Sequence, residues 1–156
     1  RPNKQHLAQS FAQKMFSIQK RVDTVMISGN DLMQASMSGP DHCAIIISHS
    51  GQTSHILHLA KKLKNKHTPI IAITSISKST LVNLSDVSLR ISSREMLNTK
   101  IGDFASTESI TCILDILYSC YFSLNYKENL NYKLSIAGEI DDQYSEYEYI
   151  DETKIK

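Results

Sequence analysis

The sequence predicts an α/β fold, a three-layer α-β-α sandwich built around a mainly parallel, doubly wound sheet. Two apolar runs, residues 44–47 and 69–74, have the composition of central strands buried on both faces. Apolar residues at helical spacing follow the first run and also mark residues 4–20 and 104–126. Strands that alternate with helices are typical of parallel sheets joined by right-handed crossovers. Ligands of such folds bind beyond the C-terminal ends of the strands, so a site is expected in the loops there.

The N-terminal part is expected to hold two helices with a short strand between them. Residues 4–20 repeat apolar side chains every three or four positions, as an amphipathic helix does. Residues 22–27 form a short β-prone run. Asn30 or Asp31 can cap a short helix over residues 32–37, which a Gly-Pro pair then ends.

The remaining elements alternate in the same way. A helix with one apolar side is expected directly after residue 53, between the two buried strands. Residues 79–84 predict one or two helical turns, and residues 87–91 alternate as an outer strand does. The longest helix is expected over residues 104–126, and a shorter one around residues 128–134 is possible by pattern.

Length and charge predict one domain followed by an acidic tail. The 156 residues are 41% hydrophobic and 21% charged, which excludes a disordered chain and a membrane protein. The net charge of +1 is unevenly spread, because residues 139–156 hold seven acidic side chains and two lysines. Residues 1–138 therefore form the expected domain, mildly basic at +6, and residues 139–156 a flexible tail at −5.

Several classes of site are excluded by residue pattern. Three cysteines without close pairing indicate reduced thiols, and with no leader or apolar span they predict a cytoplasmic protein without membrane contact. His55 and His58 are expected on a solvated helix face, and no histidine has the spacing of a metal site. We expect no metal and no cofactor.

One motif carries candidate chemistry, and it lies between the first buried strand and the next helix: Ser48-His49-Ser50-Gly51-Gln52-Thr53. The hydroxyls of Ser48, Ser50 and Thr53 can donate to phosphate oxygens, and Gly51 lets the backbone approach a ligand closely. The helix N-terminus adds unpaired N–H groups, so the motif predicts a phosphate cradle without a lysine. Helix capping by Ser50 or Thr53 is the alternative that needs no ligand.

Other loop chemistries do not fit this motif. A Walker loop is excluded because no Gly-Lys-Ser/Thr sequence follows a glycine at the required distance. A nucleophile elbow is disfavoured because Ser48 stands two residues before Ser50, where that elbow has glycine.

Residues 45–53 resemble the signature strand and loop of SIS domains, the sugar isomerase fold that binds phosphosugars, with its pattern Ser-x-Ser-Gly-x-Thr. Residues 70–89 resemble the second strand, short helix and following strand of that family. Residues 101–118 resemble the last large helix of RpiR-type transcriptional regulators. The resemblance implies a flavodoxin- or Rossmann-like sandwich that lacks its first strand and the glycine loop after it.

The resemblance also implies a function and a set of ligand-binding residues. The chain is expected to be the phosphosugar-sensing and dimerisation domain of an RpiR-type DNA-binding regulator of carbohydrate metabolism. Its partners would be a sugar phosphate effector, a second copy of the chain, and DNA through a helix-turn-helix domain absent from this chain. The ligand would contact these residues: Ser48, Ser50, Gly51, Gln52, Thr53 and Glu95.

Two alternatives remain open at this point. The expected regulator domain is not an enzyme and has no catalytic residue. In SIS isomerases, however, a glutamate in the region of Glu95 acts as the general base, so an aldose–ketose phosphate isomerase is the first alternative. A dimerisation scaffold with an inactive ligand site is the second.

Overall fold

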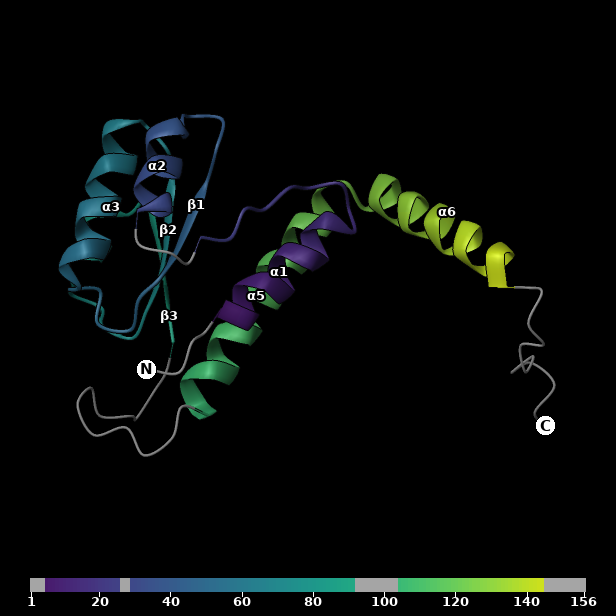
Figure 1. Ribbon diagram of the computed structural model, residues 1–156. Helices are drawn as coiled ribbons and strands as arrows, with labels where there is room; N and C mark the ends of the chain where they lie inside the picture. Colours follow the sequence, from purple (N-terminus) through teal and green to yellow (C-terminus); the bar gives the residue numbers. More distant parts are fainter. Residues whose placement is uncertain (1–4, 26–28, 92–103, 145–156) are drawn as a thin grey trace.

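The computed structural model describes residues 5–25, 29–91 and 104–144, and Figure 1 shows their arrangement. Helices and strands alternate through the middle of the chain, and two long helices follow. The elements in order are α1 (Gln5–Phe16), α2 (Asn30–Met37), β1 (Ala44–Ile47), α3 (Ser54–Asn65), β2 (Ile70–Thr74), α4 (Thr80–Leu84), β3 (Val87–Arg90), α5 (Phe104–Leu124) and α6 (Tyr126–Tyr144).

The three described strands form one parallel sheet in the order β1-β2-β3. Ala44 pairs with Ile70, and Ile71 pairs with Val87, so the three strands start at the same edge. Both apolar runs of the sequence are therefore strands, with β2 in the centre of the described sheet. The C-terminal ends of the strands meet at the opposite edge, where the predicted loop lies.

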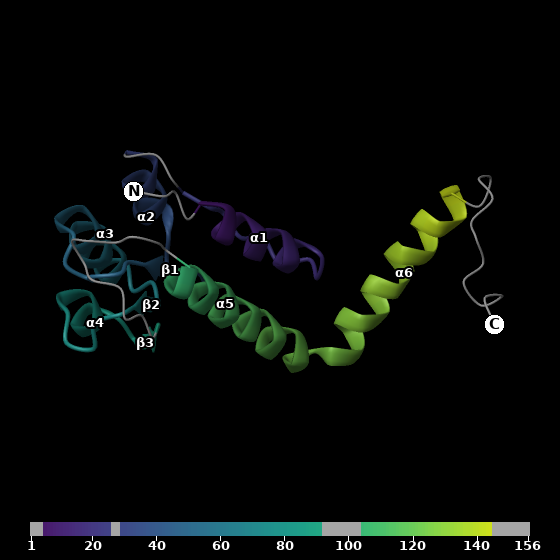
Figure 2. The same cartoon turned by 90° about the horizontal axis from the view of Figure 1, so that it is seen from below.

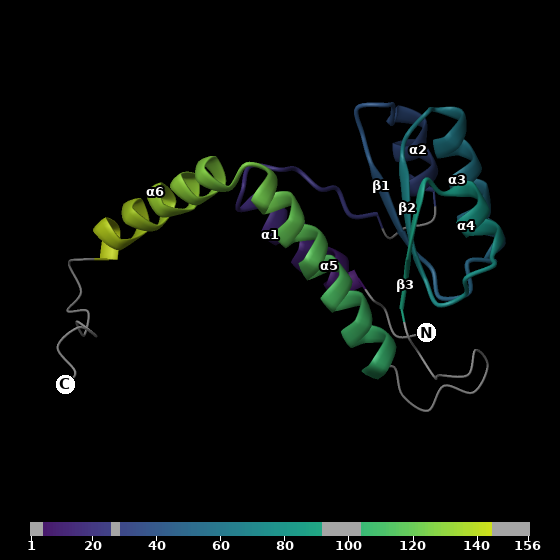
Figure 3. The same cartoon turned by 180° about the vertical axis from the view of Figure 1, so that it is seen from behind.

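Helices cover both faces of the sheet, which confirms the three-layer prediction. Alternate strand residues point to opposite faces. Ile46 and Ala72 belong to the core beneath α2, α3 and α4. Ile73 and Ile91 belong to the core beneath α1 and α5. The views of Figures 1 and 3 show α2 and α3 on one side of the strands and the α1–α5 pair on the other.

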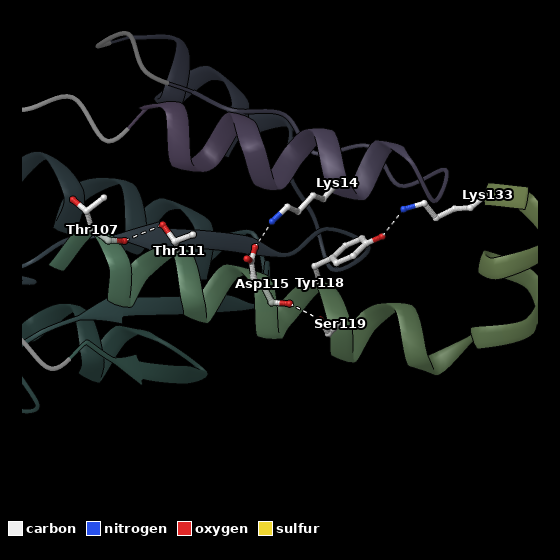
Figure 4. A network of polar contacts seen from close by, with 7 residues as sticks. All are labelled: Lys14, Thr107, Thr111, Asp115, Tyr118, Ser119 and Lys133. Carbon is white, nitrogen blue, oxygen red and sulfur yellow. Dashed lines mark hydrogen bonds and ion pairs between the residues drawn. The ribbon is translucent and has the colours of Figure 1, made fainter. Parts of the chain in front are cut away.

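Helices α1 and α5 lie side by side although they come from distant parts of the chain (Figure 2). Apolar residues of both helices join the core on that face of the sheet, among them Phe11 of α1 and Leu114 of α5. Lys14 also donates to the Asp115 carboxylate across the helix pair, as Figure 4 shows.

Helix α6 contacts the rest of the chain mainly at its first turns. The Asn129 side chain donates to the Phe122 carbonyl oxygen over 3.0 Å. Lys133 donates to the Tyr118 hydroxyl over 3.4 Å (Figure 4). The Tyr126 ring meets the Phe122 ring edge-on at a centroid distance of 5.7 Å. Beyond these contacts α6 extends away from the sheet (Figure 1).

Three predicted elements differ from the observed ones. The first helix was expected over residues 4–20 but ends at Phe16. Residues 21–25, the start of the predicted strand over residues 22–27, have no regular secondary structure, and residues 26–28 lie outside the description. The last helix was expected around residues 128–134 but continues to Tyr144. The predicted boundary between residues 138 and 139 therefore falls inside α6, and residues 145–156 lie outside the description.

Among the helices described, none has both the length and the apolar character that a bilayer crossing requires.

A hydroxyl-rich loop at the N-terminus of helix α3

The predicted motif, residues 48–53, forms the loop that leads from β1 to α3 at the C-terminal edge of the sheet. The Ser48 N–H donates to the Ile73 carbonyl oxygen over 3.0 Å. The His49 carbonyl oxygen accepts from the Ser75 N–H over 3.1 Å and from the Thr74 hydroxyl over 3.0 Å. These bonds hold the loop against the end of β2, which is where parallel α/β domains bind their ligands.

Gly51 is required by the shape of the loop. Its φ of +61° is in the left-handed region, which L-residues with a side chain adopt at a cost. A Cβ atom at this position would lie 2.3 Å from the Ser79 Oγ and 2.8 Å from the Ser79 Cβ. The loop backbone therefore packs directly on the first turn of α4, with no room for a side chain between them.

Two loop hydroxyls accept hydrogen bonds from the loop itself and keep their own protons for another acceptor. The Ser48 Oγ accepts from the Gly51 N–H, and the Ser50 Oγ accepts from the Gln52 N–H, both over 3.3 Å. A serine hydroxyl that accepts in this way still has one O–H donor. Ser48 is buried at 8% exposed, whereas Ser50 is partly exposed.

Thr53 directly precedes α3 as its N-cap residue, but its side chain makes no capping hydrogen bond. The capping alternative therefore does not account for Thr53. The first N–H groups of α3 have no partner within the helix, and with the helix dipole they favour an anion at this end. The loop and helix together provide hydroxyl and amide donors without a cation of their own.

The first turn of α4 packs against the loop, a contact that the motif did not reveal. Leu81 donates its N–H to the Gly51 carbonyl oxygen over 3.1 Å. The Thr80 hydroxyl donates to the Gln52 Oε1 over 2.9 Å. The available signal was the run of hydroxyl residues after β2, because the C-terminal ends of neighbouring parallel strands meet at one edge.

His55, in the first turn of α3, is exposed as predicted, and it also pairs with the Asp31 carboxylate at the start of α2. Burial raises the pKa of Asp31, but hydrogen bonds from His55 and from the N–H groups of Leu32 and Gly29 outweigh it, so the pKa lies below its ordinary value. This pair links the N-termini of α2 and α3 beside the loop.

Of the six predicted ligand residues, the structure brings five together in this loop, and the sixth, Glu95, lies outside the described residues. Within the described part of the chain, no three His, Cys, Asp or Glu side chains gather as they would around a metal ion.

The structure is thus a parallel α/β domain with a hydroxyl-rich loop at a helix N-terminus. The family model of the SIS domain matches residues 3–119, and this chain belongs to the SIS domain family. The predicted resemblance is therefore confirmed at the level of the family.

One curated relative with a similar sequence is a regulator. An uncharacterized HTH-type transcriptional regulator of Thermotoga maritima is 37% identical over 98 residues, which cover 60% of this chain and 34% of the relative. This chain thus spans about a third of the length of that curated relative.

Three solved structures share the fold. The Vibrio vulnificus NanR protein complexed with ManNAc-6P has a TM-score of 0.76 at 23% identity, over 88% of this chain and 52% of that chain. The sugar isomerase domain of an RpiR transcription factor from Sphaerobacter thermophilus has a TM-score of 0.69 at 13% identity, over 85% of this chain and 72% of that chain. A putative sugar-phosphate isomerase from Listeria monocytogenes has a TM-score of 0.65 at 19% identity, over 81% of this chain and 67% of that chain.

Proposed function

We propose that this chain is the effector-binding domain of an RpiR-type transcriptional regulator and that its effector is a sugar phosphate. The observation that carries the proposal is the loop of residues 48–53, whose serine hydroxyls keep their donor protons at the N-terminus of α3. A phosphate group accepts hydrogen bonds and carries negative charge, so it fits both the donors and the helix dipole.

The similar proteins support the regulator over an enzyme. The Thermotoga maritima relative is an HTH-type regulator, and the NanR structure contains a phosphorylated sugar. In a protein of this kind, a separate helix-turn-helix domain would bind the DNA. Such a protein acts on the chromosome, so we expect it in the cytoplasm and not at a membrane.

The ligand would be held by the loop hydroxyls of Ser48, Ser50 and Thr53, by the Gln52 amide, and by N–H groups of the loop and helix. Close approach of the ligand depends on the compact backbone at Gly51. Binding can regulate DNA contacts only if the ligand has unequal affinity for two arrangements of the protein. Two arrangements of a dimer would meet this requirement.

The surface of α5 supports a homodimer. Only Glu108 and Asp115 are charged among its 21 residues, and Lys14 neutralises Asp115. A helix that is apolar on most sides is usually covered on most sides. On the side away from the core, however, Ile116 is 56% exposed, in a shallow groove that Cys112 and Cys120 line together with Glu108 and Asp115. A second copy, related by two-fold symmetry, is the partner we propose for this side.

Calorimetric titration with a panel of hexose and pentose phosphates tests the ligand. We expect saturable binding of at least one sugar phosphate, strong weakening in Ser50→Ala, and unchanged affinity in Ser36→Ala. Ser36 is the matched control because its hydroxyl bonds only the Leu32 carbonyl oxygen of its own helix. Absence of saturable binding to any member of the panel contradicts the proposal and leaves a dimerisation scaffold.

The isomerase remains the second candidate because the Listeria monocytogenes structure shares the fold. It requires a base, and Glu95 is the residue we would assign to that role. A coupled assay that detects aldose–ketose interconversion in the wild type and none in Glu95→Gln would replace the regulator proposal with this one.

A further inference from the structure

Three contacts fasten the loop of residues 48–53 to the first turn of α4, and they differ in kind. Two involve the buried backbone: the Leu81 N–H donates to the Gly51 carbonyl oxygen, and Ser79 packs against Gly51. The third joins two side chains, because the Thr80 hydroxyl donates to the Gln52 Oε1 over 2.9 Å.

The side-chain contact is not needed to fill the core. Ser79 and Leu81 are 1% and 0% exposed, whereas Gln52 is exposed and Thr80 is partly exposed. Water can replace an exposed hydrogen bond between side chains at little cost to folding. The contact contributes little to folding, and it joins the proposed ligand loop to the neighbouring helix α4.

The chemistry of the Gln52 amide indicates how its contact with Thr80 would act on a ligand. A glutamine side chain ends in one acceptor oxygen and one NH₂ group with two donors. When the oxygen accepts from Thr80, the NH₂ group is left to donate elsewhere. A phosphate has only acceptor oxygens at neutral pH, so the donor end attracts it and the acceptor end repels it.

We infer that Thr80 is a positioning residue that orients the Gln52 amide so that its N–H donors face the bound phosphate. This inference rests on the proposed sugar phosphate ligand and adds a second loop to the binding site. Thr80 does not touch the ligand in this arrangement and acts only through Gln52.

The size of the effect follows from the freedom of the side chain. Without the Thr80 hydroxyl, the amide of Gln52 rotates and must be fixed when the ligand binds. Immobilising one such side chain weakens affinity about three- to tenfold. Thr80→Val removes the hydroxyl and retains the branched shape, whereas Thr80→Ser retains the hydroxyl.

The test titrates the full chain with inorganic phosphate and with ManNAc-6P, and it follows the ¹⁵N side-chain resonance of Gln52 by NMR. We expect Thr80→Val to raise the dissociation constant about three- to tenfold, Thr80→Ser to restore it, and the melting temperature to change little. The Gln52 NH₂ resonance should shift on binding in the wild type and in Thr80→Ser, and less in Thr80→Val. A purely structural role would not move this resonance.

A double-mutant cycle with Gln52→Met identifies the route of the effect. If Thr80 acts through Gln52, Thr80→Val has no further effect on affinity when Gln52 is already methionine. An equal loss in both backgrounds overturns the inference, as does wild-type affinity in Thr80→Val. If the wild type binds neither probe and no other sugar phosphate of the panel, the proposed function itself fails, which is a different result.

Discussion

Gly51→Ala is predicted to destabilise the chain and to distort the loop of residues 48–53 at the same time. Alanine at a φ of +61° costs about 1–2 kcal/mol relative to glycine. The new Cβ would also lie 2.3 Å from the Ser79 Oγ and 3.3 Å from the Leu81 Cβ. Forcing a methyl group into such a contact costs about 1–3 kcal/mol.

Together these effects predict a loss of about 2–5 kcal/mol, a large share of the stability of a domain of this size. The melting temperature should fall by roughly 5–15 °C. Ser79 cannot move freely, because it is 1% exposed and its Oγ accepts from the Val82 N–H at the start of α4. The loop is therefore expected to shift instead, and sugar phosphate affinity to fall more than in Ser50→Ala.

The assay is urea unfolding followed by circular dichroism, with titration of a sugar phosphate at a temperature where the variant is folded. Two glycines serve as controls. Gly29→Ala meets nothing within 4 Å but has a φ of +108°, outside the left-handed region of Gly51, so it shows a backbone cost without a packing clash. Gly138→Ala lies in α6 with nothing within 4 Å and should be neutral or stabilising by about 0.5–1 kcal/mol. If Gly51→Ala loses no more than about 1–2 kcal/mol, the cost expected for the left-handed backbone alone, the argument from close packing is wrong.

Three further predictions concern other parts of the fold. Asp31→Asn should be less stable than the wild type near pH 7, and the difference should disappear as the pH falls through the lowered pKa of Asp31, because this carboxylate stabilises the fold only while it is ionised. Urea unfolding as a function of pH measures this, and a constant difference would contradict it. Ile116→Lys should shift a dimer towards the monomer in light scattering, whereas Val87→Lys, which alters an apolar residue 49% exposed on β3, should not. Ile73→Ala should cost about 2–5 kcal/mol in urea unfolding, because Ile73 is 0% exposed in the core beneath α1 and α5, and a loss below 1 kcal/mol would show that this core collapses around the cavity.

The sequence was sufficient to predict the elements that combine several independent signals. Strands β1 and β2 are apolar runs that end in hydroxyl residues, and both were predicted within one residue of their observed bounds. Helix α3 was predicted from its apolar side and from the motif before it. Local propensity, periodicity and loop chemistry agree at these positions, and such agreement makes a prediction reliable.

The errors occurred where the tertiary environment decides the structure. Residues 22–25 are β-prone, but no described strand pairs with them, and β-propensity has little effect without a neighbouring strand. Helix α6 continues through Gly138, which a pattern-based prediction takes as a stop signal.

The hydroxyl-rich loop could be located from the sequence, and the hydroxyl run after β2 pointed to its neighbour, but the individual contacts between the loop and α4 could not be predicted. The hydroxyl residues and the glycine of residues 48–53 can be recognised in the sequence by their type and spacing. The contact of Thr80 with Gln52 and the fit of Ser79 against Gly51 depend on where α4 packs. A sequence separation of 28 residues between Thr80 and Gln52 leaves no periodic signal to detect.

The pairing of α1 with α5 has a consequence for how the chain folds. Lys14 and Asp115 are 101 residues apart in the sequence, yet they close the same face of the sheet. The other face is covered by α2, α3 and α4, which are close to β1 and β2 along the chain. Contacts between nearby residues form sooner than contacts that must close a long loop. During synthesis, one face of the sheet can therefore assemble early, while the other stays open until α5 has left the ribosome.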